Sequence, residues 1–346
     1  MSAKIFPLTP SKIASERSMS RIMISVVMPV YNAQRYISAS IQSILDQTES
    51  SFELVIVDDG SVDDTVGTVS KFSDQRIRLL RIAHVGIVGA LNFGCRSSHG
   101  TYIARMDADD LAYPERLHFQ LGMFERRGDI DVLCTDVDLI DEQGNVIGHE
   151  IMGDVDSESI KRGLLFESGF KPIIHPSVMM RRKVYEDLGG YRDYAFAEDY
   201  DFWLRALGAH KIVRSHQKVL KYRRNSQGIS QSNLVEQLTS TVLSLANYHA
   251  KIAYGSDFYS EARPALFAVR EDLYKMIGPI AKFINLKNAF RSAIKNPSRR
   301  NVSNLFVEAA RLRRWHYLLP GGQRRAFSQA AIEVAHRLCA AAQNLS

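Results

Sequence analysis

Five aspartates stand in two short acidic segments of the 346-residue chain, and each segment directly follows a predicted strand. The five are Asp58, Asp59, Asp107, Asp109 and Asp110. The preceding segments, 53–57 and 102–106, are short and largely apolar, as buried strands are. Because ligands bind at the carboxyl ends of the strands in a parallel sheet, both acidic segments can face one crevice. Alternate residues on an extended segment point the same way, so Asp107 and Asp109 can converge on one divalent cation that also takes phosphate oxygens and water.

Each acidic segment also has a structural interpretation. Asp110 can cap the helix that is predicted to begin near Pro114. Segment 58–61 can be a turn followed by an acidic helix start. The position of both segments after strands of one predicted sheet favours a nucleotide-diphosphate pocket over two unrelated turns.

A third group of acids opens a predicted helix over residues 198–207. Glu198, Asp199 and Asp201 stand in its first turn, where carboxylates interact favourably with the helix dipole. The functional alternative makes Asp199 a general base that faces the crevice. The spacing of the acids does not choose between the two interpretations.

The elements that must position these residues alternate regularly. Strands are predicted at 24–30, 53–57, 77–82 and 102–106, with helices at 34–47, 65–72, 86–97 and 114–127. Further strand patterns cover 132–147, with a turn at 142–145, and 176–180. This alternation predicts an α/β fold with a parallel, doubly wound sheet. We expect a flexible tail over 1–20, an α/β domain over 21–235 and a helical, basic extension over 236–346.

Several motifs occur in the order that a known enzyme family has. They are VMPVYN at 27–32, ELVIVDDGS at 53–61, GALN at 89–92, GTYIARMDADD at 100–110, PER at 114–116, GGY at 189–191 and AEDYDFWLR at 197–205. With them the stretch 24–232 resembles the family 2 inverting glycosyltransferases. The resemblance implies the GT-A fold, a Rossmann-like and mostly parallel central sheet flanked by helices. The all-helical extension lies outside it.

The resemblance also implies a site for a nucleotide-sugar donor, with UDP as the expected nucleotide. By position, Pro29, Tyr31 and Asn32 would line the nucleoside pocket, and Asp58 would accept a hydrogen bond from the uracil ring. Asp107 would lie near the ribose. Asp109 would bind Mg²⁺ or Mn²⁺, which bridges the diphosphate.

On the acceptor side, Asp199 matches the family's catalytic base, and Glu198 stands beside it. Arg105 and Arg116 would either neutralise phosphate or pair with nearby acids. His175 fits a family position near the acceptor, and a satisfied core histidine is the alternative.

Asn225 stands where many relatives carry a histidine close to the metal or the diphosphate. Asparagine can still hydrogen-bond there, but this departure puts a metal-ligand role in question. The Gln-x-x-Arg-Trp segment and the membrane spans of the processive polymerases are also missing from this sequence. We therefore expect transfer of single sugars, by direct displacement that inverts the anomeric centre.

Charge and cysteine content bear on the partners and the cellular compartment of the protein. The net charge of +6 comes from the C-terminal third, where 16 basic and 6 acidic residues follow position 239. Such a local balance, without a recognition motif, does not indicate nucleic-acid binding. Three cysteines without metal spacing indicate a reducing compartment, and residues 1–20 lack the apolar region of a secretory signal. We expect a cytoplasmic protein.

The basic C-terminal segment has two interpretations. Three arginines at 311–314 precede Trp315 and Tyr317, and basic residues beside aromatics suit an anionic membrane surface. The enzyme would then be peripheral on the inner face of the membrane. The alternative is a helical cap on the catalytic domain, or a contact between copies in a homo-oligomer.

The expected function is metal-dependent, inverting transfer of one sugar from a nucleotide sugar to a hydroxyl of a cell-surface glycan or glycolipid acceptor. A sugar nucleotidyltransferase would need a Gly-x-Gly-x-Arg loop after the first strand, where this chain has Pro-Val-Tyr-Asn. The alternative from another class is a non-catalytic subunit that binds nucleotide sugars or assists assembly in a polysaccharide system.

Overall fold

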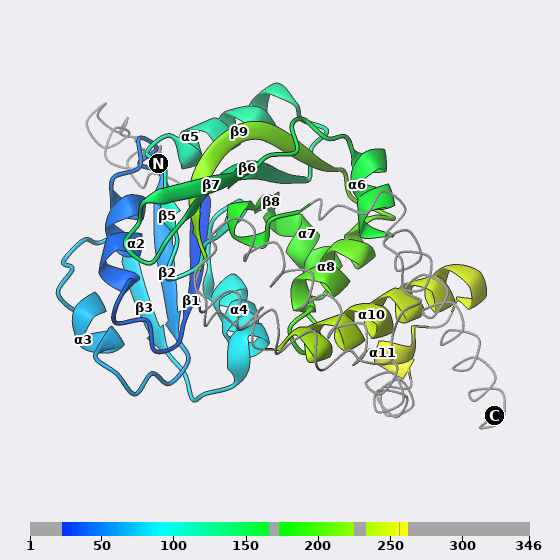
Figure 1. Cartoon of the computed structure of the whole chain (residues 1–346), viewed down its shortest axis with the longest axis horizontal. Helices are drawn as coiled ribbons and strands as arrows, with labels where there is room; N and C mark the ends of the chain where they lie inside the picture. The colour runs from blue at the N-terminus through cyan, green and yellow to red at the C-terminus, as the bar shows by residue number, and fades with distance from the viewer. Residues whose placement is uncertain (1–22, 166–172, 225–232, 256, 262–346) are drawn as a thin grey trace, which may run out of the picture.

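The computed structural model describes residues 23–165, 173–224, 233–255 and 257–261. Within them the chain forms one nine-stranded sheet with helices on both faces (Figure 1). The expected tail over 1–20 and residues 262–346 of the expected extension lie outside the described residues, as does Asn225.

The first half of the sheet is parallel, as predicted. Its strands are β1 (Ile24–Val30), β2 (Phe52–Asp58), β3 (Ile77–Arg81) and β4 (Tyr102–Arg105). They lie in the order β3-β2-β1-β4, with every pair in this half parallel. All residues of β1 and β2 are buried, which explains their nearly continuous apolar sequence.

The second half of the sheet is mixed. It contains β8 (Met179–Arg181), β6 (Val132–Ile140) and β9 (Ile212–Arg223), with β7 (Val146–Glu150) and β5 (Leu111–Ala112) at its edges. β6 and β9 are parallel, whereas β8, β7 and β5 run antiparallel to their neighbours. The sequence analysis did not predict β9, because charged residues interrupt its apolar pattern. Its Arg214 is fully buried and pairs with Asp136 of β6 at 2.7 Å.

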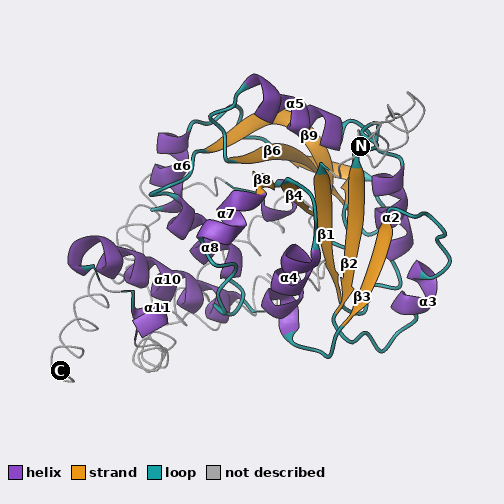
Figure 2. Cartoon of the chain, turned by 180° about the vertical axis from the view of Figure 1, so that it is seen from behind, coloured by secondary structure: helices purple, strands orange, loops and turns teal. Residues whose placement is uncertain are grey.

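Helices cover both faces of the sheet (Figure 2). They are α2 (Ile37–Leu45), α3 (Thr65–Val69), α4 (Gly86–Ser97), α5 (Arg116–Arg126), α6 (Ser157–Leu164), α7 (Arg182–Asp187) and α8 (Glu198–Ala206), with a 3₁₀ turn at His175–Ser177. Alternate residues of β1 belong to two different cores. Val26 and Met28 share one core with residues of α2 and α5, and Val27 shares the other with residues of α4 and α8. The GT-A architecture predicted from the motifs is thus the observed one.

Two helices follow the sheet, α10 (Leu234–Tyr254) and α11 (Phe258–Glu261). α10 packs against α8, and Val242, Leu243 and Ala246 belong to the same buried core as Phe202 of α8. Among the described residues, no helix is both long and apolar enough to cross a membrane.

Candidate active site

The carboxyl ends of β1 and β2 bring three of the predicted residues together. In the parallel register, Val30 lies opposite Asp58, and the Asp59 N–H donates to the Val30 carbonyl at 2.8 Å. The chain that leaves β1 at Tyr31 and Asn32 therefore runs beside the aspartates that end β2.

Asp58 is buried but not fully used by the protein. Its Oδ1 accepts the Ser61 N–H at 3.3 Å. Its Oδ2 makes no hydrogen bond and lies 3.7 Å from the Arg81 Nε. On β1, Pro29 directly precedes Val30; it is buried and lies opposite Val57. Asp58 thus retains an acceptor oxygen for a ligand at this edge of the sheet.

Asp59, in contrast, has a structural role. Its two carboxylate oxygens accept the backbone N–H groups of Val85 and Gly86 at 2.8 and 2.9 Å, at the N-terminus of α4. The His84 Nδ1 lies 2.9 Å from the same carboxylate. The two adjacent aspartates therefore differ: Asp59 supports the start of α4, and the ligand role of Asp58 stays a prediction.

An exposed aromatic pair lies beside Asp58. The Tyr31 side chain is 48% exposed and stacks on the His84 ring, with centroids 4.3 Å apart. Asn32 has a left-handed backbone (φ 50°); its Oδ1 accepts the Val62 N–H and its own N–H donates to the Ser61 Oγ, both at 2.9 Å. The sequence analysis missed His84, because no motif signal marks it.

Three carboxylates meet just beyond β4. Asp107, Asp109 and Asp110 each offer an oxygen within 4.8 Å of the others. Burial, and then the charge of Asp107, raise the pKa of Asp109 to about 6. Burial and both neighbouring carboxylates raise the pKa of Asp110 well above its usual range. This repulsion is what a bound cation would relieve, and oxygen donors are what Mg²⁺ and Mn²⁺ prefer.

Asp110 is not the helix cap that the structural interpretation made it, and that interpretation is wrong. α5 begins at Arg116, and its N-cap residue is Glu115. Instead, the Asp110 Oδ1 accepts the Arg223 N–H of β9 at 2.8 Å, and its buried Oδ2 makes no hydrogen bond. Asp110 is thus a third carboxylate of the cluster, which the sequence analysis did not assign to a metal.

The two arginines considered for phosphate have separate places. Arg105 is buried and forms an ion pair with Asp107. Arg116 is fully buried and donates to the backbone carbonyls of Arg105 and Pro176 at 2.6 and 2.9 Å. Arg116 therefore supports the chain around the site rather than pairing with an acid.

The first turn of α8 brings a further carboxylate pair. Burial, and next the charge of Asp199, raise the pKa of Glu198 to about 7. Asp107 adds to this rise and Arg105 opposes it, which places the start of α8 within electrostatic reach of the end of β4. The Asp199 Oδ1 accepts the Tyr200 N–H at 2.7 Å.

His175 lies in the buried layer behind this turn. Its Nε2 lies 3.0 Å from the Tyr191 hydroxyl, and its ring meets the Trp203 ring edge-on at 5.7 Å. Burial, and then the charge of Arg105, hold its pKa well below the usual range, so the imidazole is neutral. These contacts satisfy a core histidine, and the acceptor-site role of His175 stays a prediction.

Comparisons with known proteins give the class. Residues 25–189 match the family described as Glycosyl transferase family 2. The O-antigen biosynthesis glycosyltransferase WbnJ of Escherichia coli is 32% identical over 218 residues, which cover 61% of this chain and 84% of WbnJ. The chain belongs to glycosyltransferase family 2, which confirms the resemblance. This chain matches 65% of the length of an uncharacterized glycosyltransferase of Haemophilus influenzae and 66% of the putative glycosyltransferase EpsE of Bacillus subtilis.

Solved structures give the same fold at low identity. Residues 1–349 of S. aureus TarS in complex with UDP-GlcNAc match with a TM-score of 0.54 and 17% identity, covering 85% of this chain and 93% of TarS. The mannosyltransferase PcManGT from Pyrobaculum calidifontis, in complex with GDP-Man and Mn²⁺, matches with a TM-score of 0.50 and 18% identity. This match covers 91% of this chain and 86% of the mannosyltransferase.

Proposed function

We propose that this protein transfers one sugar from a UDP-sugar to a hydroxyl of a cell-surface glycan or glycolipid, with inversion at the anomeric carbon. The observation that carries the proposal is the cluster of Asp107, Asp109 and Asp110 at the end of β4, within electrostatic reach of the acids that open α8.

The nucleoside end of the donor would lie at the ends of β1 and β2. The exposed Tyr31 ring offers a stacking surface, and Asp58 offers the acceptor that a uracil N–H requires. Pro29 and Asn32 shape the chain that presents them. The TarS complex with UDP-GlcNAc supports UDP as the nucleotide.

The carboxylate cluster would hold the divalent cation. Asp109 is the proposed ligand, Asp110 is an additional candidate, and Asp107 lies toward the ribose. A cation bound there would neutralise the charge that develops on the departing diphosphate. Mg²⁺ and Mn²⁺ are the proposed ions, and the mannosyltransferase complex with Mn²⁺ supports the choice. Arg105, paired with Asp107, adds a fixed positive charge beside the cluster.

Asp199 would act as the base on the opposite side of the sugar. The acceptor oxygen forms a bond to the anomeric carbon while the bond from that carbon to the diphosphate oxygen breaks. UDP leaves with the electron pair, and the Asp199 carboxylate takes the proton of the attacking hydroxyl. Burial and the charge of Asp199 raise the pKa of Glu198 to about 7, so Glu198 is the alternative base if Asp199 does not serve. Glu198, His175 and Asn225 remain candidates for contacts to the acceptor or the phosphates.

We further propose a cytoplasmic enzyme that is peripheral to the membrane through its basic C-terminal segment. The role of WbnJ in O-antigen biosynthesis supports an acceptor on the cell surface. A non-catalytic subunit would bind the same donor without consuming it.

A panel of nucleotide sugars tests the proposal. Each is screened with Mn²⁺ for thermal stabilisation, since binding to the native state alone raises its stability. Donors that bind are then assayed for release of free nucleotide. Metal-dependent release of UDP supports transfer. Binding of a nucleotide sugar with no release in the presence of lipid-linked or glycan acceptors would favour the non-catalytic subunit.

A further inference from the structure

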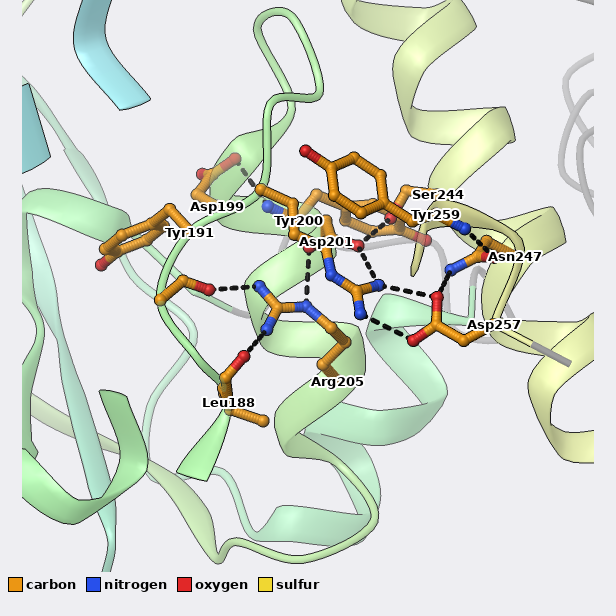
Figure 3. A network of polar contacts seen from close by, with 12 residues as sticks. Leu188, Tyr191, Asp199, Tyr200, Asp201, Arg205, Ser244, Asn247, Asp257 and Tyr259 are labelled. Carbon is orange, nitrogen blue, oxygen red and sulfur yellow. Dashed lines mark hydrogen bonds and ion pairs between the residues drawn. The ribbon is translucent and has the colours of Figure 1, made fainter. Parts of the chain in front are cut away.

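A network of alternating charges connects α8 to Asp257, which directly precedes α11, the last described helix. The Arg205 Nε donates to the Asp201 Oδ2 at 2.8 Å, one helical turn away, and the Asp201 Oδ1 lies 4.0 Å from the Arg192 Nη1. Arg192 forms a bidentate pair with Asp257, at 3.1 and 2.6 Å. Figure 3 shows Asp201 and Arg205 on one side of this network and Asp257 on the other.

Most side chains of this network are shielded from water. The side chains of Asp201, Asp257 and Arg192 are 2%, 13% and 15% exposed. Asn247 of α10 supports the outer carboxylate, since its Nδ2 donates to the Asp257 Oδ1 at 3.0 Å. Removing one partner of a shielded pair is costly because it leaves the other charge uncompensated.

The network holds the loop over 188–197, which connects α7 to α8. Arg205 donates to the Gly190 carbonyl at 2.8 Å. Asn92 of α4 holds the next residue from both sides, because its Oδ1 accepts the Tyr191 N–H and its Nδ2 donates to the Tyr191 carbonyl, both at 2.9 Å. The first part of the loop is therefore fixed by α4 and α8.

The second part of the loop depends on α11. The Tyr259 hydroxyl accepts the Asp193 N–H at 2.8 Å, and the Arg192 guanidinium lies 4.8 Å from the Tyr259 ring centroid. Phe196 then takes a left-handed backbone (φ 61°), directly before Ala197, the N-cap residue of α8. A bulky residue keeps such a conformation only where its surroundings enforce it.

We propose that Asp257 is a positioning residue: by holding Arg192 it fixes this loop and, through it, the first turn of α8 that carries Asp199. The inference rests on the proposed function, because the base role of Asp199 is what makes its position matter. Asp257, which directly precedes α11, lies outside the 25–189 segment that matches the family, so it supplies a support that this segment does not contain.

The test is Asp257→Asn in the full-length protein. A loosened base lowers turnover, since a misplacement of about 1 Å costs about 10²-fold. We expect kcat for sugar transfer to fall about tenfold or more, while the donor Kd changes by less than about twofold, because the donor residues follow β1, β2 and β4. Hydrogen exchange should accelerate in peptides over 188–201 and stay unchanged in β1 to β4.

Three further variants test the interpretation. Asp129→Asn makes the same substitution in an exposed ion pair with Lys211, outside this network, and it should alter neither kcat nor exchange over 188–201. Asp257→Glu keeps the charge and should recover part of kcat. If Asp257→Asn proves unstable, Asn247→Ala removes the supporting hydrogen bonds to Asp257 and to the Tyr259 N–H and should give the same changes in milder form.

Three results would overturn the proposal. One is unchanged exchange over 188–201 in Asp257→Asn. Another is unchanged kcat in an active enzyme. The third is a parallel loss of kcat, donor affinity and melting temperature, which indicates general destabilisation. If the wild-type protein transfers no sugar from any donor, the proposed function fails, and exchange alone decides whether Asp257 holds the start of α8.

Discussion

Arg105 and Asp107 form an ion pair at the end of β4, and their charges act both on Asp109 of the carboxylate cluster and on Glu198 at the start of α8. The positive charge of Arg105 lowers the pKa of both Asp109 and Glu198, against the larger effects of burial and of neighbouring acids. The proposed donor and acceptor sides of the site thus share the influence of one buried guanidinium. Substitutions on one side should be tested for effects on the other.

Asp109→Ala should abolish Mn²⁺-dependent binding of the nucleotide sugar and leave the fold intact. Removing one of three crowded carboxylates also relieves repulsion, so the melting temperature without metal should stay the same or rise. Calorimetry with and without Mn²⁺ measures the first effect. Asp46→Ala, at an exposed aspartate beside α2, is the matched control. Unchanged Mn²⁺-dependent affinity would remove Asp109 from the metal site.

Metal affinity should depend on pH in a defined direction. A pKa of about 6 means that Asp109 carries a proton below pH 6, and this proton must leave before the carboxylate can bind a cation. Mn²⁺ affinity should therefore fall below pH 6, by up to about tenfold per pH unit, and level off above about pH 7. Titrations in two buffers of different ionisation enthalpy measure the released proton. Constant affinity from pH 5 to 7 would contradict this assignment.

Asp58→Ala should weaken binding of UDP itself, since the proposed contact is to the base. Loss of one hydrogen bond to a charged group costs about 1.5–3 kcal/mol, or roughly tenfold to a hundredfold in Kd. Asp59→Ala is the contrasting variant. It should lower the melting temperature, because two N–H groups at the start of α4 lose their acceptor. If UDP affinity follows Asp59 rather than Asp58, the roles of the two aspartates are reversed.

The strands of the parallel half could be predicted because their sequence patterns are simple. β1 and β2 are buried on both faces, so their sequences are continuous apolar runs. β9 could not be recognised, since Arg214 and Lys218 interrupt its pattern. Their charges are compensated by Asp136 and Asp138 of β6, partners that only the folded sheet brings near.

The positions of the candidate site residues could be predicted where they stand in a sequence motif. The positions of Asp58 and Asp109 followed from strand ends in the motifs. The membership of Asp110 in the cluster depends on β9, which holds it through the Arg223 N–H. The place of His84 beside Tyr31 likewise depends on how the start of α4 meets the end of β2. These contacts join segments far apart in sequence, and no local pattern encodes them.

Deleting residues 300–346 should reduce attachment to anionic vesicles more than it reduces donor binding. The deleted basic residues are Arg300, Arg311, Arg313, Arg314, Arg324, Arg325 and Arg337, against the acids Glu308 and Glu333. Basic side chains near an anionic surface contribute about 1 kcal/mol each and are screened by salt.

Sedimentation with vesicles at low and high salt separates the two interpretations of this segment. Trp315 and Tyr317 should add a component that salt does not remove. A structural cap predicts that the truncated protein melts earlier and that the full-length protein ignores vesicles. No binding of the full-length protein at low salt would end the membrane hypothesis.

Asp199→Asn tests the central claim most directly, that this site transfers sugar with Asp199 as the base. The measurement is sugar transfer to an acceptor with Mn²⁺, alongside the donor Kd of the same preparation. The isosteric amide cannot take the proton, so donor affinity should be unchanged while transfer falls by about 10²-fold or more. Glu198→Gln, at the adjacent acid, should retain more activity. Near-normal turnover of Asp199→Asn with normal donor affinity would contradict the mechanism and move the base elsewhere.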